Sequence, residues 1–265
     1  MTDSPTPRTD ETVLRVEDVA VQFGGIRALD GVSFGIGPGE RVGVVGPNGS
    51  GKTTLLNCIS GSNRPFDGSV WINGVSTERR TPDAISRSGL ARTFQAPRIF
   101  PDLTLIENLA FVALQRHRAG ILSTVVRTPR TRAARTAALE QSAEVIHFLG
   151  LEDKTQLAAG ALSYGQRKLL AIGLGLMTDP QILCLDEPLA GVNPSMVRTI
   201  EDLLLELNGD GLTLLIIEHN MEFIARFVER TIVMVEGSVL ADGPTGDVTD
   251  REDVIAALMG QEMHR

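Results

Sequence analysis

The sequence predicts an α/β fold with a parallel sheet core, an antiparallel β subdomain near the N-terminus and an inserted helical subdomain. Apolar segments that read as strands alternate with helical patterns, which is typical of a parallel sheet. One predicted strand runs into a glycine-rich loop, and two others end in acidic or histidine residues. Ligands of open α/β sheets bind at such strand ends, so these loops are candidate binding sites.

The predicted elements follow one another along the chain. Residues 1–12 are rich in proline, threonine and aspartate and are expected to be disordered. From Val13 the pattern is strand-like, with Val32, Phe34 and Ile36 in alternation before the turn Gly37-Pro38-Gly39. Buried strands are expected at 41–45, 182–185, 212–217 and 231–235, and helices at 53–60 and 196–207.

The stretch from about 97 to 162 is helical in pattern and has no clear buried strand. We therefore expect a single domain over 13–260, in which 13–95 and 163–260 form the α/β core and 96–162 the helical subdomain. Residues 261–265 are expected to be a short tail.

Composition excludes several classes of protein. The 265 residues carry a net charge of −8, whereas a general nucleic-acid binder needs a basic surface. No apolar run approaches the roughly 18 residues of a membrane span, and Met1 to Pro7 lack the pattern of a secretory signal. Cys58 and Cys184 have apolar neighbours and no metal-site spacing, so buried thiols in a reducing cytoplasm are expected.

The segment Gly46-Pro47-Asn48-Gly49-Ser50-Gly51-Lys52-Thr53 fits the pattern GxxxxGK[ST], with a strand before it and a helix after it. Its backbone N–H groups and the helix N-terminus are expected to bind phosphate oxygens, with Thr54 among the nucleotide contacts. Lys52 supplies charge for the β- and γ-phosphates and Thr53 a hydroxyl for Mg²⁺. The core is therefore expected to be a P-loop NTPase of the RecA-like type.

Asp186 follows the strand 182–185, where an aspartate can hold Mg²⁺ directly or through water. Glu187 comes next and is placed to polarise an attacking water. The alternative is an ordinary acidic turn before Pro188, which the P-loop in the same chain disfavours.

P-loop proteins include kinases, GTPases and many ATPases, and the segment Leu162-Ser-Tyr-Gly-Gln166 indicates which of these classes this sequence fits. It resembles the LSGGQ signature of the ABC ATPase superfamily and lies 20 residues before Asp186, in the usual order. The resemblance implies that Ser163, Gly165 and Gln166 hold the γ-phosphate of ATP bound to another subunit, in a dimer that closes on two ATP molecules. The alternative for an isolated segment is a plain helix N-cap by Ser163.

Three further positions match the superfamily. Gln95 occupies the place of the Q-loop glutamine, which in relatives reaches Mg²⁺ and the lytic water and moves with the helical subdomain. His219 matches the switch histidine that contacts the γ-phosphate. Phe23 precedes Gly46 by 23 residues, where relatives place an aromatic ring that stacks on adenine; a core phenylalanine is the alternative.

Two positions depart from the common pattern of the superfamily. Tyr164 replaces the second glycine of LSGGQ, so the backbone is less free at that point. Asn193 lies in Leu189-Ala-Gly-Val-Asn193-Pro, where many relatives have SALD, and it loses a charge while keeping hydrogen-bonding capacity.

Several segments together resemble the LivG-type ATP-binding subunits of branched-chain amino acid importers. They are 23–29 (FGGIRAL), 91–95 (ARTFQ), 105–109 (LIENL), 190–194 (AGVNP), 217–221 (IEHNM) and 254–260 (VIAALMG). The resemblance implies a second ATPase subunit, identical or a shorter paralogue, two membrane permeases and an external binding protein. It implies a peripheral location on the cytoplasmic face of the bacterial inner membrane. The net negative charge argues against a nucleic-acid partner.

Importers of urea and short amides and lipopolysaccharide-export ATPases share much of this pattern and stay open as alternatives. A non-transport ABC ATPase is a further alternative, although such proteins tend to have tandem nucleotide domains or a long coiled coil. A small-molecule kinase is disfavoured by the signature segment.

The segment from Asn108 to Leu139 contains no acidic residue and six arginines, at positions 116, 118, 127, 130, 132 and 135. We interpret it as a face toward the anionic inner leaflet or the permease, where each basic residue adds roughly 1 kcal/mol of binding. A solvated basic face is the alternative.

Overall fold

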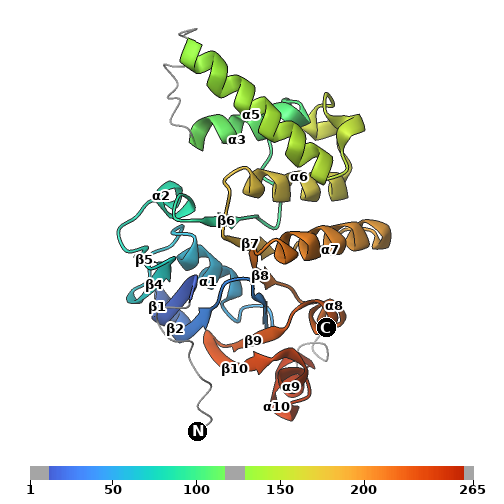
Figure 1. Cartoon of the computed structure of the whole chain (residues 1–265). Coiled ribbons are helices and arrows are strands. Elements are labelled where there is room, and N and C mark those ends of the chain that lie inside the picture. The colour runs from blue at the N-terminus through green and yellow to red at the C-terminus, as the bar shows by residue number, and fades with distance from the viewer. Residues whose placement is uncertain (1–11, 117–128, 260–265) are drawn as a thin grey trace. The chain divides into compact units, whose positions relative to one another are not determined.

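The computed structural model describes residues 12–116 and 129–259 (Figure 1). The chain divides into two compact units. Of the described residues, the core unit contains 12–92, 181–188 and 207–259, and the helical unit contains 93–116, 129–180 and 189–206. The sequence-based boundaries assigned residues 93–95, 163–180 and 189–206 to the α/β core, whereas their contacts group them with the helical unit.

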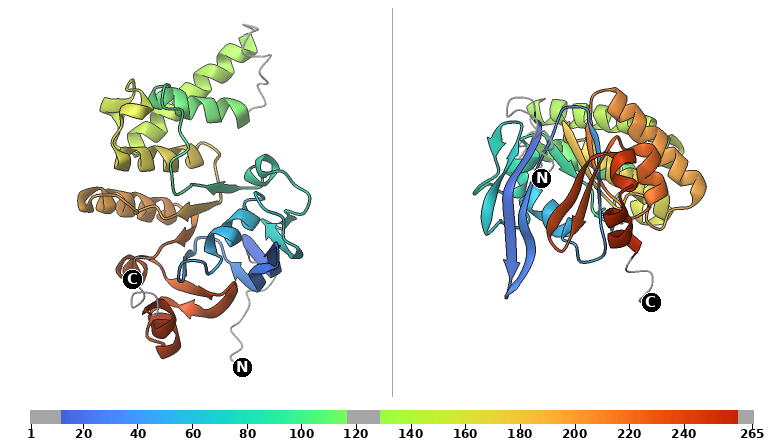
Figure 2. Two further views of the ribbon diagram at one scale, coloured as in Figure 1. Left: turned by 180° about the vertical axis from the view of Figure 1, so that it is seen from behind. Right: turned by 90° about the horizontal axis from the view of Figure 1, so that it is seen from below.

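The first sheet of the core unit is antiparallel, with the strand order β2-β1-β4-β5. Its strands are β1 (Leu14–Phe23), β2 (Ile26–Ile36), β4 (Asp67–Ile72) and β5 (Val75–Ser76). Gly24 and Gly25 join β1 to β2 with φ of +59° and +141°, a backbone that favours glycine in a two-residue hairpin. This long hairpin is visible in the right-hand view of Figure 2.

The second sheet has the order β10-β9-β3-β8-β7-β6 and is parallel except for β10. Its strands are β3 (Arg41–Val45), β6 (Leu90–Arg92), β7 (Ile182–Asp186), β8 (Thr213–Ile217), β9 (Arg230–Val235) and β10 (Ser238–Pro244). Nearly every residue of β3, β7 and β8 is buried, as expected for strands covered on both faces. The predicted parallel core is confirmed, while β4, β5, β6 and β10 were not predicted.

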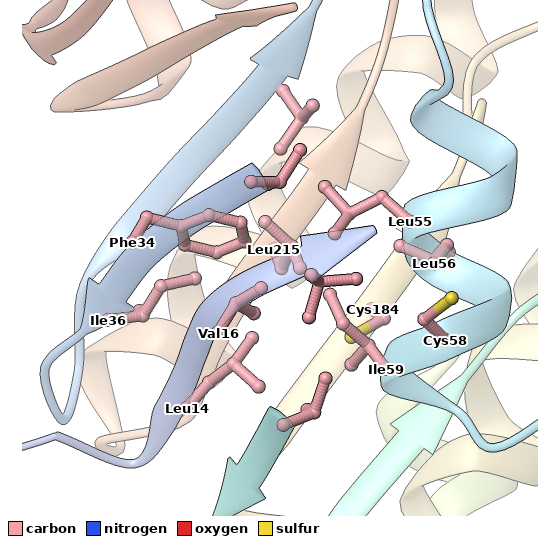
Figure 3. Close-up of a cluster of buried hydrophobic side chains, with 14 of the residues drawn as sticks. Leu14, Val16, Phe34, Ile36, Leu55, Leu56, Cys58, Ile59, Cys184 and Leu215 are labelled. Carbon is pink, nitrogen blue, oxygen red and sulfur yellow. The ribbon is translucent and has the colours of Figure 1, made fainter. Parts of the chain in front are cut away.

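The helices of the core unit are α1 (Lys52–Ile59), α2 (Pro82–Ser86), α8 (Met221–Phe227), α9 (Thr245–Thr249) and α10 (Glu252–Met259). The inner face of α1 joins a hydrophobic cluster to which both sheets contribute (Figure 3). Cys58 and Cys184 belong to this cluster as free thiols, as expected. Burial raises the pKa of Cys58 to about 11 and that of Cys184 to about 12, so both thiols stay protonated at neutral pH.

The helical unit is built from α3 (Leu105–Arg116), α5 (Pro129–Phe148), α6 (Tyr164–Leu176), the part of α7 (Pro194–Gly209) up to Glu206, and the short 3-10 helices η1 (Glu152–Lys154) and η2 (Ala159–Ala161). Helices α3, α5 and α6 contact one another. A Cβ at Gly173 would lie 2.7 Å from Leu149 Cδ1, so glycine allows the close approach of α6 to the end of α5. The predicted inserted helical region is confirmed.

In residues 12–116 and 129–259 no helix is both long and apolar enough to span a membrane.

Arg92, the last residue of β6, makes an ion pair across the core unit. Its Nη2 atom lies 3.1 Å from Asp186 Oδ2 at the end of β7, and both side chains are almost fully buried. The Nη1 atom donates to Asn57 Oδ1 at 2.7 Å and to Ser60 Oγ at 2.9 Å. One guanidinium therefore joins two strands of the sheet to α1 and its C-cap.

Replacing Arg92 by methionine is expected to destabilise the protein by about 3 kcal/mol, because a buried carboxylate loses its ionic partner. Urea unfolding of the pure protein measures this change. The matched control is Arg251→Met, which breaks the exposed pair with Asp253 (2.6 Å) and is expected to change stability by less than about 1 kcal/mol. Equal effects of the two substitutions would show that the buried pair is no more important than a surface pair.

Candidate functional site

The carboxyl ends of β3, β8 and β7 lie side by side in the core unit. The parallel register pairs Val44 with Ile217 and Ile217 with Asp186, so the three strands end at the same level. The P-loop follows β3, Glu218-His219 follows β8, and Glu187 follows β7. The sheet therefore brings together three groups of candidate residues that lie far apart in the sequence.

The P-loop needs glycine at both of its ends. Gly46 has φ of +153°, and a Cβ there would lie 2.1 Å from the carbonyl oxygen of Met234. Gly51 has φ of +100°, and its Cβ would lie 2.5 Å from the carbonyl oxygen of Ala28. The Ser50 carbonyl oxygen accepts a hydrogen bond from Gly237 N at 3.1 Å. The loop is thus fitted closely against the neighbouring backbone, which fixes its shape before any ligand binds.

Lys52 folds back on its own loop. Its Nζ donates to the carbonyl oxygens of Gly46 at 2.7 Å and Pro47 at 2.9 Å. Burial lowers the pKa of Lys52, while the negative charges of Glu187 and Asp186 act in the opposite direction. The ammonium is therefore positioned by the loop and lies in the field of the carboxylates after β7.

The N-terminus of α1 is open to an anion. Gly51 is its N-cap and provides no side-chain hydrogen bond, and the first turn contains no acidic residue. The unbonded N–H groups of a helix start carry partial positive charge. Thr53 is exposed at this end and Thr54 is half-buried. This arrangement can bind phosphate.

Oxygen donors at the site fit Mg²⁺. Asp186 offers a carboxylate and Thr53 a hydroxyl, and Mg²⁺ is usually held by one or two carboxylates together with phosphates and water. Within residues 12–116 and 129–259 no group of three or more His, Cys, Asp or Glu side chains could form a metal cage. Asp186 and Thr53 are therefore the oxygen donors in this part of the core unit that suit a hard cation.

Glu187 has a strained backbone, with φ of +47°. Its N–H donates to the carbonyl oxygen of Ile217 at 2.9 Å, which fixes the start of the turn after β7. Non-glycine residues in this conformation cost about 1–3 kcal/mol and are concentrated at functional sites. The side chain of Glu187 is only partly exposed, and one of its neighbours is His219.

His219 lies with its Nδ1 atom 3.8 Å from Glu187 Oε1 and 3.9 Å from Glu218 Oε2. Glu218 is buried, and its carboxylate accepts a hydrogen bond from the backbone N of His219 at 3.2 Å. Asn220 caps α8 by accepting from Phe223 N at 3.0 Å. The backbone around His219 is thus held on both sides, while its imidazole is exposed at the site.

Phe23 lies at the tip of the β1–β2 hairpin and is 53% exposed. The alternative of a core phenylalanine is therefore wrong, and the ring is free to stack on a ligand.

The remaining candidates lie in the helical unit. Gln95 is exposed, and its backbone oxygen accepts a hydrogen bond from Lys168 Nζ at 2.8 Å. Ser163 forms a capping box with Gln166, in which Ser163 Oγ accepts from Gln166 N at 3.3 Å and Gln166 Oε1 accepts from Ser163 N at 2.9 Å. The N-cap alternative for Ser163 is thus realised, and because the hydroxyl acts there as an acceptor, its own proton can still be donated to another group.

Two residues have roles that sequence reasoning missed. Arg92 belongs to the segment 91–95. A three-residue strand has too little pattern to indicate that the guanidinium of its last residue pairs with Asp186. Asn193 caps α7, because its Oδ1 accepts hydrogen bonds from Met196 N at 2.9 Å and Ser195 Oγ at 2.8 Å. An asparagine directly before Pro194 is a common start of a helix and could have been recognised as a cap.

Known proteins resemble this chain over nearly all of its length. The family model described as ABC transporter matches residues 29–190. The high-affinity branched-chain amino acid transport ATP-binding protein LivG of Escherichia coli K12 is 35% identical over 252 residues, which cover 95% of this chain and 99% of that protein.

Solved structures show the same fold. The ADP conformation of an ATP-binding cassette of an ABC transporter matches with a TM-score of 0.80 and 32% identity, covering 94% of this chain and 99% of that one. A dimeric cassette in a post-hydrolysis state bound to ADP and phosphate matches with a TM-score of 0.74 and 27% identity, covering 88% and 98%. The family model covers more than half of this chain, and the relative LivG is matched over nearly its whole length. This chain therefore belongs to the ABC transporter family of ATP-binding subunits.

Proposed function

We propose that this chain is the ATP-hydrolysing subunit of an ABC importer for branched-chain or other small amino acids. The observation that carries the proposal is the alignment of the P-loop, Asp186-Glu187 and His219 on three adjacent strand ends. The substrate class rests on the similarity to LivG, whose name gives branched-chain amino acids as its cargo. Urea or amide import and lipopolysaccharide-type export are the alternative cargo assignments.

The proposed reaction is in-line attack of water on the γ-phosphate of ATP. Phosphoryl transfer needs mostly positioning and charge stabilisation. The P-loop N–H groups of residues 46–51 and the Lys52 ammonium bind the phosphates, while Glu187 accepts a proton from the attacking water. His219 lies near Glu187, from where it would contact the γ-phosphate. Mg²⁺, held by Thr53, Asp186 and Gln95, would neutralise charge on the phosphate oxygens.

The proposed active form is a dimer that closes on two ATP molecules. Phe23 stacks on the adenine, and Ser163, Gly165 and Gln166 of the other subunit hold the γ-phosphate. The exposed N-terminus of α6 and the acceptor role of the Ser163 hydroxyl support this assignment. The second subunit is either another copy of this chain or a shorter paralogue.

The proposed partners are two transmembrane permeases, which an external substrate-binding protein supplies with cargo. Dimer closure would move the helical unit, and a permease helix docked near Gln95 would follow. The chain would then sit on the cytoplasmic face of the bacterial inner membrane without spanning it.

Purification of the tagged protein from detergent-solubilised membranes tests the assembly. Two permeases should co-purify with the protein, and leucine uptake should stop in cells from which its gene is deleted. Recovery with ribosomes or DNA instead would contradict a transport role.

Replacing Glu187 by glutamine is expected to lower ATP hydrolysis by about 100-fold or more, because the general base is lost. ATP binding should persist, so the variant should accumulate as an ATP-bound dimer, measured by size-exclusion chromatography with and without ATP. The matched control is Glu236→Gln, since Glu236 has the same φ of +47° but lies in the β9–β10 turn. Near-normal hydrolysis by the Glu187 variant would refute its assigned role.

Replacing Phe23 by alanine is expected to weaken ATP binding about tenfold, because stacking of an aromatic ring on a base contributes about 1–3 kcal/mol. Titration calorimetry with ATP measures the change. Phe66→Ala is the control, because Phe66 is 81% exposed in the same unit and is not part of the proposed site. Equal affinities of the Phe23 variant and the unmodified protein would exclude adenine stacking.

The arginine-rich segment is tested separately. Arg132 and Arg135 are exposed on α5, while Arg118 and Arg127 lie outside the described residues. Neutralising Arg127, Arg130, Arg132 and Arg135 should reduce binding to anionic liposomes by several hundredfold, given roughly 1 kcal/mol per basic residue. Neutralising the exposed Arg64, Arg79 and Arg80 is the control. If liposome and permease binding stay unchanged, the segment is a solvated basic face.

A further inference from the structure

Tyr164 covers Gly191 within the helical unit. A Cβ built on Gly191 would lie 3.2 Å from Tyr164 Cε1 and 3.7 Å from Cδ1. A real Cβ at that distance would be tighter than ordinary van der Waals contact, so the aromatic ring occupies the space into which a side chain at Gly191 would project. Tyr164, which departs from the common family pattern, is therefore packed against Gly191 in the segment 189–193, which also contains the second departure, Asn193.

The residue after Tyr164 makes a second contact with the same part of the chain. A Cβ on Gly165 would lie 2.6 Å from Met196 Cγ, at the start of α7. The position of Met196 is set by Asn193, whose Oδ1 accepts a hydrogen bond from its backbone N at 2.9 Å. Two consecutive signature residues thus rest on the segment from Gly191 to Met196.

Lys168 connects the same ring to Gln95. It is one turn further along α6, is only 4% exposed, and its Nζ lies 5.7 Å from the centroid of the Tyr164 ring. That distance is within the range of a cation–π interaction. The same Nζ donates to the backbone oxygen of Gln95 at 2.8 Å. A buried ammonium needs such partners, so its position is tied to both residues.

We propose that Tyr164 is a positioning residue which, with Lys168, joins the signature, the turn at 189–193 and Gln95 into one junction. A change in position of the signature on binding nucleotide would then move the other two segments, because a rigid ring and a buried hydrogen-bonded cation connect them. This inference rests on the proposed function, which assigns the signature and Gln95 to nucleotide.

The packing is tested by a double-mutant cycle in urea unfolding with Gly191→Ala, Tyr164→Gly and the double variant. Gly191 has φ of +72°, so alanine is strained there whatever surrounds it. Gly150→Ala measures that strain alone, because Gly150 has φ of +65° with no atom within 4 Å of its Cβ. Gly191→Ala should raise the equilibrium constant of unfolding about tenfold more than Gly150→Ala does. In a protein that already carries Tyr164→Gly, adding Gly191→Ala should raise this constant only as much as Gly150→Ala does. Additive effects would overturn the contact.

Transmission is tested by amide hydrogen exchange in the Glu187→Gln background, with and without ATP. ATP should slow exchange in peptides covering 46–54, 93–97 and 189–196. Adding Tyr164→Gly should leave the protection of 46–54 and reduce that of the other two peptides about fivefold or more. Unchanged protection at 93–97 and 189–196 would overturn the junction. If 46–54 shows no protection in the Glu187→Gln protein itself, the proposed function fails, and the unfolding cycle alone decides on the junction's contact.

Discussion

The geometry of the site depends on the hydrogen-bonded register of three buried parallel strands. Val44, Ile217 and Asp186 are aligned across β3, β8 and β7, so the residues that follow each strand emerge at one level. These strands are covered on both faces, and their backbone groups must pair with one another because water cannot reach them. A slip of one residue would turn each side chain to the opposite face of the sheet and separate Asp186 from the P-loop.

Charge balance is the second constraint on the core unit. Asp186 ends β7, Glu187 and Glu218 directly follow β7 and β8, and the side chains of Asp186 and Glu218 are buried. Arg92 forms an ion pair with Asp186, and the negative charges of Asp186 and Glu187 raise the pKa of Lys52 against the effect of its burial. Two cations from the protein itself therefore balance part of the negative charge at these strand ends.

Sequence patterns predicted the long, uniformly apolar strands and missed the short or mixed ones. The strands at 41–45, 182–185, 212–217 and 231–235 stand out because burial on both faces requires consecutive apolar residues. Strand β6 has three residues and ends in a charge, and β10 contains Asp242 and Gly243, so neither gives a period that could be recognised. The same limitation hid Arg92, since a charged residue at a strand end ordinarily faces solvent.

The sequence by itself determined the chemistry, because a phosphate-binding loop and its lysine form from a few consecutive residues whose spacing is visible in the chain. Tertiary structure alone decided which of those residues meet. It placed Phe23 on an exposed hairpin tip, directed Arg92 to Asp186, and laid Tyr164 on Gly191. Contacts of this kind join residues tens of positions apart, and they depend on how strands and helices pack rather than on any local pattern.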